Sequence, residues 1–316
     1  MDFSIFKNRY RISGNLEVLT ALHIGSGIEE NGYDAPFITV DGDSKNKNFY
    51  IPGSSFRGYL STKLERLLNK DNSFKLIDRK TGEELNEADV KLIFGYTNLL
   101  KKEKDKADKN NKKEKFIEDE EVIKRVLKEF LDIETIERAL KYEEERNKEE
   151  KKKDEAAFEE AKKYSSMSGK IHISDMKILS KFNKSIKRDG IKIDRNTGAT
   201  EKGGKFDYDI LPPETEFEFI MELDNVEDYQ LDLIKIALID ILEGDLFGGK
   251  ISRGIGKCQL ILNEVEFIDA KDKQDLENYI FKKDMRKIVS EKDDKEVEKN
   301  KEFKDFFEIK KLKLGK

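Results

Sequence analysis

The stretch FYIPGSSFRGYLSTKLERLL (residues 49–68) runs from the end of a strand through a tight turn into an amphipathic helix. Ser54 or Ser55 stands where a helix N-cap is expected. The free N–H groups at a helix N-terminus attract phosphate, and Ser54, Ser55 and Arg57 would add donors there. Taken alone, an ordinary serine cap with Arg57 in water is the simpler interpretation. The apolar positions near helical spacing are Phe56, Tyr59, Leu60, Leu64, Leu67 and Leu68.

The composition limits the class of protein. Of 316 residues, 41% are charged and 36% are hydrophobic, so part of the chain must lie outside any packed core. The net charge of −5 argues against a uniformly basic nucleic-acid-binding protein, although a groove needs only local positive charge. No apolar run is long enough to span a bilayer, and the first residues lack a signal core, so we expect no membrane partner and no export. The single cysteine, Cys258, excludes an internal disulfide and favours a cytoplasmic protein.

The order of strands and helices indicates the fold class. TEFEFIMELDN alternates apolar and polar residues as a half-buried strand does, and YQLDLIKIALIDILEGDLFGG has the strongest helical pattern in the chain. With the charged middle of the chain set aside, the order is close to β-α-β-β-α-β. We therefore predict an α+β fold, a ferredoxin-like (RRM-like) palm with both helices on one face of an antiparallel sheet. The expected strands include residues 9–27, 169–179, 215–225 and 256–270.

Runs of charged residues and glycines mark the expected boundaries between the palm, the insertion, the hairpin and the tail. Two runs of Lys and Glu enclose an apolar-periodic stretch, which predicts a charged helical insertion with flexible or solvated arms at residues 69–164. The palm would then comprise residues 1–68 and 165–270. Glycines and charges between two short extended runs predict a protruding hairpin or long loop at residues 191–212. We expect residues 271–316 to form a charged C-terminal tail, with one helix and a loose end.

A second glycine-rich turn, GGKISRGIGK (residues 248–257), follows the second palm helix. Glycines let the backbone adopt positive φ or approach a ligand closely. Backbone N–H groups together with cations would form a phosphate cradle, although the loop lacks the order and setting of a P-loop. A tight connection with solvated charges explains the spacing equally well. The candidate RNA-binding residues here are Gly248, Gly249, Lys250, Ser252, Arg253 and Gly254.

Several of these blocks, taken in order, resemble a known family. LTALHIGSG, YDAPFI, YIPGSSFRGYLSTKLERLL, IFG, IDRNTGATEKGGKFDYDILPPETEF and LFGGKISRGIGKCQL are similar to blocks of the RAMP superfamily of CRISPR-associated proteins. The chain most resembles the backbone (Csm/Cmr-type) subunit of type III effector complexes. The resemblance covers roughly residues 10–269, and the long charged insertion departs from the compact members of the family.

The resemblance implies an antiviral ribonucleoprotein. Copies of such a subunit stack as a filament along a guide RNA (crRNA), beside other type III CRISPR effector subunits. Each copy has a palm and a thumb-like hairpin that wedges into the duplex of guide and target RNA. In active members an aspartate after the first strand cleaves the target RNA endonucleolytically.

The resemblance also assigns candidate site residues. Asp34, in GYDAPF, matches the catalytic aspartate and would hold a divalent metal ion, Mg²⁺ or Mn²⁺. The thumb matches residues 191–212, and the glycine-rich loop matches residues 248–256. Phe206 would be an apolar wedge between bases, or a core residue at the base of the hairpin. The guide-backbone turn would contain Gly53, Ser54, Ser55 and Arg57, and the thumb would use Ile193, Arg195, Lys202 and Phe206.

The chemistry expected at Asp34 follows from RNA itself. A 2′-OH attacks the adjacent phosphate when it lies in line with the leaving 5′-oxygen, and a wedge that displaces one nucleotide permits that geometry. Asp34 would accept the 2′-OH proton or hold the metal ion. Without the resemblance, a lone Asp in such a loop is a turn former. Three alternatives stay open: a non-catalytic RNA-binding subunit, a guide-processing endonuclease that uses His23, and a protein–protein scaffold built on the charged helices.

Overall fold

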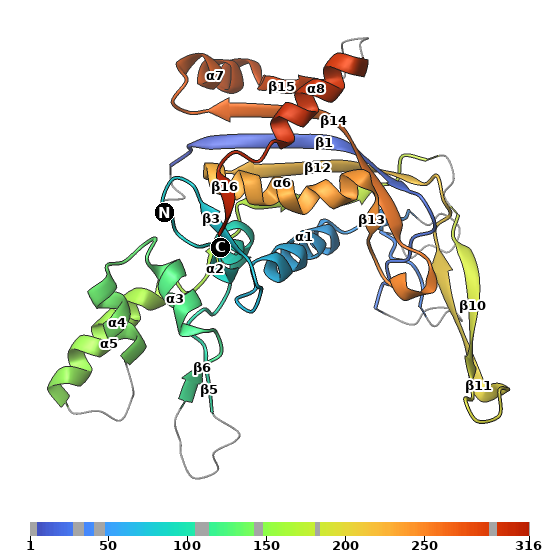
Figure 1. Ribbon diagram of the computed structural model, residues 1–316, viewed down its shortest axis with the longest axis horizontal. Coiled ribbons are helices and arrows are strands. Elements are labelled where there is room, and N and C mark those ends of the chain that lie inside the picture. Colours follow the sequence, from blue (N-terminus) through green and yellow to red (C-terminus); the bar gives the residue numbers. More distant parts are fainter. Residues whose placement is uncertain are drawn as a thin grey trace.

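The central layer of the protein is an antiparallel sheet with helices on one face (Figure 1). The computed structural model describes residues 5–27, 35–40, 48–104, 114–141, 148–180, 184–290 and 296–315. Three long strands form the middle of the sheet, and a short strand forms one edge. These strands are β1 (Asn8–Val18), β12 (Glu216–Asp224), β14 (Lys257–Asp269) and the short β8 (Ile171–Ile173).

The strand order confirms the predicted fold class. Hydrogen bonding places β14, β1, β12 and β8 next to one another in that order, and each pairing is antiparallel. Helix α1 (Gly53–Leu67) lies between β1 and β8 along the chain, and α6 (Asp228–Glu243) lies between β12 and β14. This succession is the β-α-β-β-α-β unit of a ferredoxin-like palm.

The core lies between the sheet and the two palm helices. Every second residue of β12 is buried, as the alternation of its sequence predicts. The Phe56 ring of α1 lies 5.4 Å, between ring centroids, from both Phe219 of β12 and Phe247. Each fully buried side chain of this kind contributes about 1.5–3 kcal/mol relative to exposure. The core therefore fixes α1 against the sheet and against the segment that follows α6.

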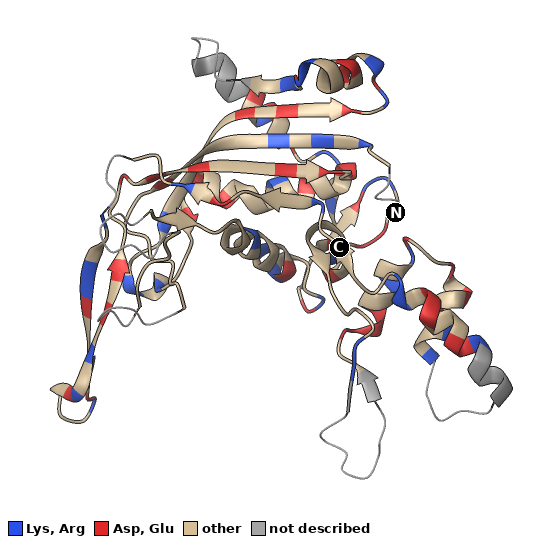
Figure 2. Cartoon of the chain, turned by 180° about the vertical axis from the view of Figure 1, so that it is seen from behind, with Lys and Arg blue, Asp and Glu red and all other residues tan. Residues whose placement is uncertain are grey.

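Residues of both charge signs lie along the strands (Figure 2), and on β1 the half-buried Arg9 and Arg11 lie on the face opposite to the core. The Arg9 guanidinium contacts Asp224 on β12, with Nε 2.6 Å from Oδ1. Arg11 contacts Glu222 on the same strand, with Nη2 2.8 Å from Oε1. Cross-strand pairs of this kind stabilise a sheet. Both arginines are thus engaged with neighbouring carboxylates, which offset their positive charge on this face.

The prediction of a loose tail at residues 271–316 is wrong for the part that the structure describes. After α7 (Lys273–Glu277) and the π-helix η2 (Asn278–Lys282), strand β15 (Arg286–Ser290) extends the sheet beside β14. Helix α8 (Glu296–Phe307) then leads to β16 (Leu312–Gly315), which pairs with β3 (Lys75–Asp78) near the start of the insertion. A few apolar side chains are enough to dock this segment, because Val289, Phe306 and Leu312 are all buried in the palm core.

The insertion is folded, and its predicted boundary at residue 69 differs from the structure. Strand β3 and α2 (Glu87–Phe94) contribute Leu76 and Phe94 to the palm core. The remainder of the insertion has a hydrophobic core of its own. It joins the palm through β4 (Gly95–Tyr96) and β7 (Met167–Ser168), which pair with each other. Parts of the charged arms, residues 105–113 and 142–147, lie outside the described residues. The described elements are β5 (Lys102–Lys104), β6 (Glu114–Phe116), α3 (Glu120–Leu127), α4 (Ile133–Lys141) and α5 (Lys148–Lys162).

Replacing Lys170 by methionine is expected to remove a pH-dependent part of the stability. Lys170 is fully buried, its Nζ donates to Gln230 Oε1 at 2.6 Å, and burial lowers its pKa from 10.5 to about 8. Between these pH values the unfolded chain binds more protons at this residue, so the wild-type free energy of unfolding gains up to about 3 kcal/mol as the pH rises.

Urea unfolding of both proteins measures this effect. Below pH 8 the K170M variant avoids the free-energy cost of a buried charge. The difference in free energy of unfolding between the variant and the wild type is therefore expected to shrink as the pH approaches 10.5. Other titrating groups cancel in the difference between the two proteins. If the difference in free energy of unfolding between the two proteins stays constant across this pH range, the assignment of a lowered pKa to Lys170 is contradicted.

Candidate nucleic-acid interface

The predicted thumb is a hairpin that projects from one end of the palm (Figure 1). It consists of β10 (Ile186–Ile193) and β11 (Thr200–Ile210), so it begins before the predicted residue 191. The early part contains cross-strand ion pairs rather than apolar alternation, which explains why the sequence pattern missed it. Lys187 Nζ lies 2.6 Å from Asp207 Oδ2, and Lys205 Nζ lies 3.2 Å from Asp189 Oδ2.

One face of the thumb carries two aromatic rings. Phe206 stands opposite Gly190, and its ring lies across the glycine, because a Cβ at residue 190 would be 2.2 Å from the ring. The Phe206 and Tyr208 rings are stacked with centroids 6.3 Å apart. Phe206 is half-buried and packs against a small cluster at the hairpin base, whereas Tyr208 is buried in that cluster. Phe206 therefore lies partly in the hairpin base and is partly exposed, and its role as a wedge between bases stays a prediction.

The glycine-rich loop folds closely against residues 21–25. A Cβ on Gly248 would lie 2.7 Å from the His23 carbonyl oxygen, so this glycine is needed for packing. Gly254 has φ of +77° with open space around it, so this glycine serves the turn itself. Four backbone amides of the loop donate hydrogen bonds to carbonyl groups of the chain. These four amides are therefore not free to bind phosphate, and the predicted backbone phosphate cradle is wrong for them. They belong to Gly249, Arg253, Gly254 and Gly256, with N···O distances of 2.6–3.1 Å.

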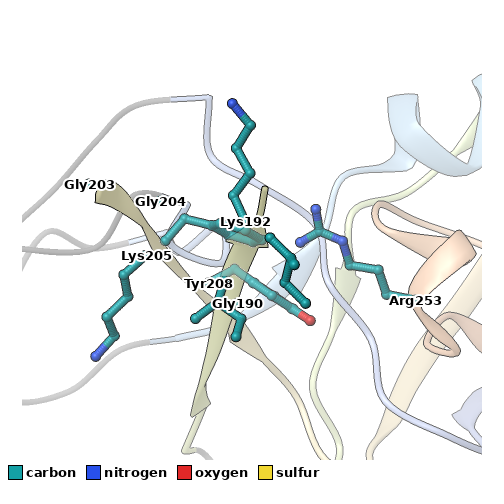
Figure 3. Close-up of a pocket in the computed structure, with 10 residues that line it drawn as sticks. Gly190, Lys192, Gly203, Gly204, Lys205, Tyr208 and Arg253 are labelled. Carbon is teal, nitrogen blue, oxygen red and sulfur yellow. The ribbon is translucent and has the colours of Figure 1, made fainter. Parts of the chain in front are cut away.

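The cations of this loop reach the aromatic face of the thumb. The Arg253 guanidinium carbon lies 4.5 Å from the Phe206 ring centroid and 5.6 Å from that of Tyr208. Lys250 Nζ lies 5.3 Å from the Tyr208 centroid. Figure 3 shows Arg253 extending from its loop toward the hairpin that carries Tyr208 and Lys192. Two elements that the sequence singled out separately therefore form one site, held by cation–π contacts.

A cavity of about 710 Å³ lies between this loop and the hairpin; we call it the thumb cavity. Ile193, one of the predicted thumb residues, lines it and is 56% exposed. Arg195 and Lys202, predicted as phosphate ligands, are exposed near the tip of the hairpin, and Ser252 is exposed in the loop. Three of the other lining side chains were not predicted from the sequence, and only Tyr208, two residues from Phe206 on the same strand face, had a spacing that pointed to the cavity. The three are Lys192, Lys205 and Tyr208.

The base of the thumb also meets the segment that follows Asp34. Asp34 itself lies outside the described residues. The next residue, Ala35, forms a parallel bridge with Tyr208, and its carbonyl oxygen accepts from the Asp209 N–H at 3.1 Å. The chain therefore reaches residue 35 beside the hairpin that carries Phe206. Among the described residues, no three His, Cys, Asp or Glu side chains gather as metal ligands, so the divalent ion expected at Asp34 stays a prediction.

His23 is a structural residue of this junction. Its side chain is buried, and Nδ1 lies 2.6 Å from the Asp209 carbonyl oxygen, so Nδ1 donates. Burial lowers the pKa of His23, which favours the neutral ring. The imidazole also makes edge contacts with Phe37 and Tyr208. The buried ring thus links residue 23, which also contacts the glycine-rich loop, to the thumb base, and its burial argues against a role as a general acid.

The N-terminus of α1 differs from the prediction. Pro52 occupies the N-cap position without a side-chain cap, so neither Ser54 nor Ser55 is the cap. The Gly53 N–H donates to Asp175 Oδ1 at 2.8 Å, which places a carboxylate of the chain where a phosphate was expected. Gly53 is required there because a Cβ would lie 2.0 Å from the Ile173 carbonyl oxygen.

Arg57 also points away from the glycine-rich loop. Its guanidinium carbon lies 5.6 Å from the Phe94 ring centroid, on the side of α1 that faces α2. At 3.6 residues per turn, Arg57 is about 200° around the helix from Ser55. Of the predicted turn residues, Ser55 alone lines the groove on the other side of α1.

That groove, called here the α1 groove, has a volume of about 810 Å³ and runs between α1 and the glycine-rich loop. Ser55, Thr62 and Arg66 line one wall at helical spacing. The other wall is formed by the end of α6, the loop and β13 (Asp245–Leu246). The loop thus contributes Gly248, Gly249 and Ile251 to this groove and Arg253 to the thumb cavity. The two hollows share one loop.

Comparison with known proteins agrees with this arrangement. The model of the RAMP superfamily matches residues 15–259, which include α1, the thumb and the glycine-rich loop. The chain belongs to the RAMP superfamily. This membership indicates a CRISPR-associated RNA-binding subunit. A search of curated proteins finds no match. No helix among the described residues is long and apolar enough to cross a membrane.

Proposed function

We propose that this chain is the guide-RNA-binding backbone subunit of a type III CRISPR effector complex and that it cleaves complementary target RNA through Asp34. Its partners would be guide RNA, target RNA, further copies of itself in a filament, and other type III subunits in the cytoplasm. The contact of Arg253 with Phe206 carries this proposal, because it joins the loop and the thumb into a single surface for a nucleotide chain.

The chemistry of this surface suits single-stranded or displaced nucleotides. Every base has a π-face, so aromatic rings bind bases without regard to sequence, and an arginine plane adds a second stacking surface. Phe206 and Arg253 supply those two surfaces, and Lys250 adds positive charge beside Tyr208. A base would stack on the outer side of Arg253 or replace it on the Phe206 ring. Either arrangement separates one nucleotide from its neighbours.

Cleavage would follow from that separation. Once a nucleotide is displaced, its 2′-OH can align with the adjacent phosphate and the leaving 5′-oxygen. We assign Asp34 to accept the proton of the 2′-OH, or to hold the Mg²⁺ or Mn²⁺ ion that would screen the phosphate charge. The products would be a 2′,3′-cyclic phosphate and a 5′-OH. The pairing of Ala35 with the thumb base supports this assignment, because it brings the chain beside the displaced nucleotide.

Some RAMP proteins are endoribonucleases, and a non-catalytic RNA-binding subunit is the second candidate. The same loop and thumb would serve it, and only the role of Asp34 would differ. A guide-processing endonuclease that depends on His23 is disfavoured by the burial of that ring. The protein–protein scaffold gains no specific support from the described part of the insertion.

Replacing Phe206 by leucine is expected to weaken RNA binding. Leucine keeps an apolar side chain of similar reach but removes the stacking face, and base–aromatic stacking is worth about 1–3 kcal/mol by alanine substitution. We therefore expect a loss of roughly 5- to 100-fold in affinity for single-stranded RNA, measured by fluorescence anisotropy of the full chain at fixed salt. The matched control is Phe281→Leu, an aromatic residue that is 79% exposed on η2, outside both hollows. Equal losses in the two variants would assign no special role to the thumb.

Replacing Asp34 by alanine separates the two candidate functions. In the assembled effector complex, D34A is expected to abolish cleavage of target RNA, because the proposed proton acceptor and metal ligand is removed. Binding of guide and target RNA is expected to stay unchanged. Gel analysis of labelled target gives the first readout, and co-purified guide RNA gives the second. Undiminished cleavage by the D34A complex refutes the catalytic assignment and leaves the RNA-binding subunit.

A further inference from the structure

The wall of the α1 groove opposite Ser55 and Thr62 carries two carboxylates. Asp245 Oδ2 accepts from the Tyr59 hydroxyl at 2.5 Å and lies 2.9 Å from Lys63 Nζ. Asp240 Oδ2 lies 2.5 Å from the same Nζ. The Asp240 side chain is 61% exposed, and that of Asp245 is 32% exposed. Both acids line the α1 groove, which a bound RNA strand would enter on the other side of the shared loop from the thumb cavity.

These acids consume the cation that a phosphate would otherwise meet. An ammonium group has three donors, and Lys63 directs them to Asp240, to Asp245 and to the Tyr59 hydroxyl, the last at 3.2 Å. Lys63, which reaches across the groove from α1, is thus neutralised, and one carboxylate charge is left over on the acidic wall. A phosphate placed against it would be repelled. The phosphates of a bound strand must then lie toward the α1 wall.

The α1 wall has the complementary chemistry. Ser55 and Thr62 provide hydroxyl donors, and Arg66 provides an exposed guanidinium, all on one face of the helix. With phosphates on that side, the sugars of the strand face Asp240 and Asp245. In a sugar–phosphate backbone the 2′-OH is the one group that can donate a hydrogen bond to a carboxylate, and DNA lacks it.

We propose that Asp240, together with Asp245, accepts a hydrogen bond from the 2′-hydroxyl of the bound strand and so selects RNA over DNA. The inference rests on the proposed RNA-binding function and adds the chemical feature by which the groove recognises its ligand. The amino groups of bases are the other donors that a carboxylate can read. Sugar reading is favoured because the aromatic surfaces for bases lie in the thumb cavity, on the other side of the shared loop.

The test compares three oligonucleotides of one sequence, made as RNA, as DNA and as 2′-O-methyl RNA. The 2′-O-methyl strand keeps the 2′-oxygen but removes its donor hydrogen. Fluorescence anisotropy with the full chain is expected to show RNA binding about tenfold or more tighter than either of the others, the size of one hydrogen bond to a charged group. In the Asp240→Ala variant the preference for RNA is expected to fall at least severalfold. The affinity for DNA is expected to rise, because the repulsion between the carboxylate and the phosphates is removed. The control Asp284→Ala removes an equal charge from an exposed position near β15 and is expected to keep the full preference.

The outcomes distinguish this inference from the function on which it rests. Equal affinity of the wild type for RNA, DNA and 2′-O-methyl RNA overturns the reading of the 2′-hydroxyl but leaves RNA binding intact. An unchanged preference in Asp240→Ala overturns the assignment to this residue. A preference that changes with base sequence in a second set of strands shows base reading and overturns the inference. Failure to bind any of the three strands overturns the proposed function itself, and the inference with it.

Discussion

The stacking of Arg253 on Phe206 is the contact on which the whole interface depends. It joins a loop after the second palm helix to a hairpin inserted between two palm strands. Two backbone conditions make it possible. Gly190 leaves room for the Phe206 ring on the hairpin, and the positive φ of Lys250 and Gly254 turns the short helix η1 (Ile251–Arg253) between them so that Arg253 faces the thumb. Without this contact the thumb cavity would be lined by residues of the hairpin alone.

The palm supplies the rigid base for this interface. Its sheet holds α1 through buried aromatic contacts, and the same contacts reach Phe247 at the start of the glycine-rich loop. Because one loop lines both hollows, a nucleotide chain that followed the α1 groove would have to cross this loop to reach the thumb cavity. The charges agree with such a path. Hydroxyl groups and Arg66 lie along α1, carboxylates lie opposite, and Lys250 and Arg253 lie over the rings.

The sequence predicts what local periodicity encodes. Alternation in β12 and helical spacing in α6 predicted the palm. The glycine-rich loop and Phe206 were singled out separately, and their contact came from the structure. Contacts between residues that are far apart in the sequence cannot be predicted from local periodicity. The His23 carbonyl binds the Gly249 amide, and Asp175 binds the Gly53 amide, so two amides expected for phosphate are already engaged. The direction of Arg57 follows from the helix period, which places it about 200° from Ser55. The packing of Phe306 in the core depends on sparse apolar residues in a charged tail, which composition conceals.

Ultraviolet crosslinking of bound RNA, with mass spectrometry of the crosslinked peptides, tests the single path most directly. Figure 1 places α1 beside α6 and the thumb at one end of the palm, whereas Arg9 and Arg11 of β1 lie on the face of the sheet opposite to the core. The account predicts crosslinks in β11 at Phe206 or Tyr208, in the glycine-rich loop and along α1, all from one sample. Crosslinks confined to the open face of the sheet, at peptides containing Arg9 and Arg11, would contradict it.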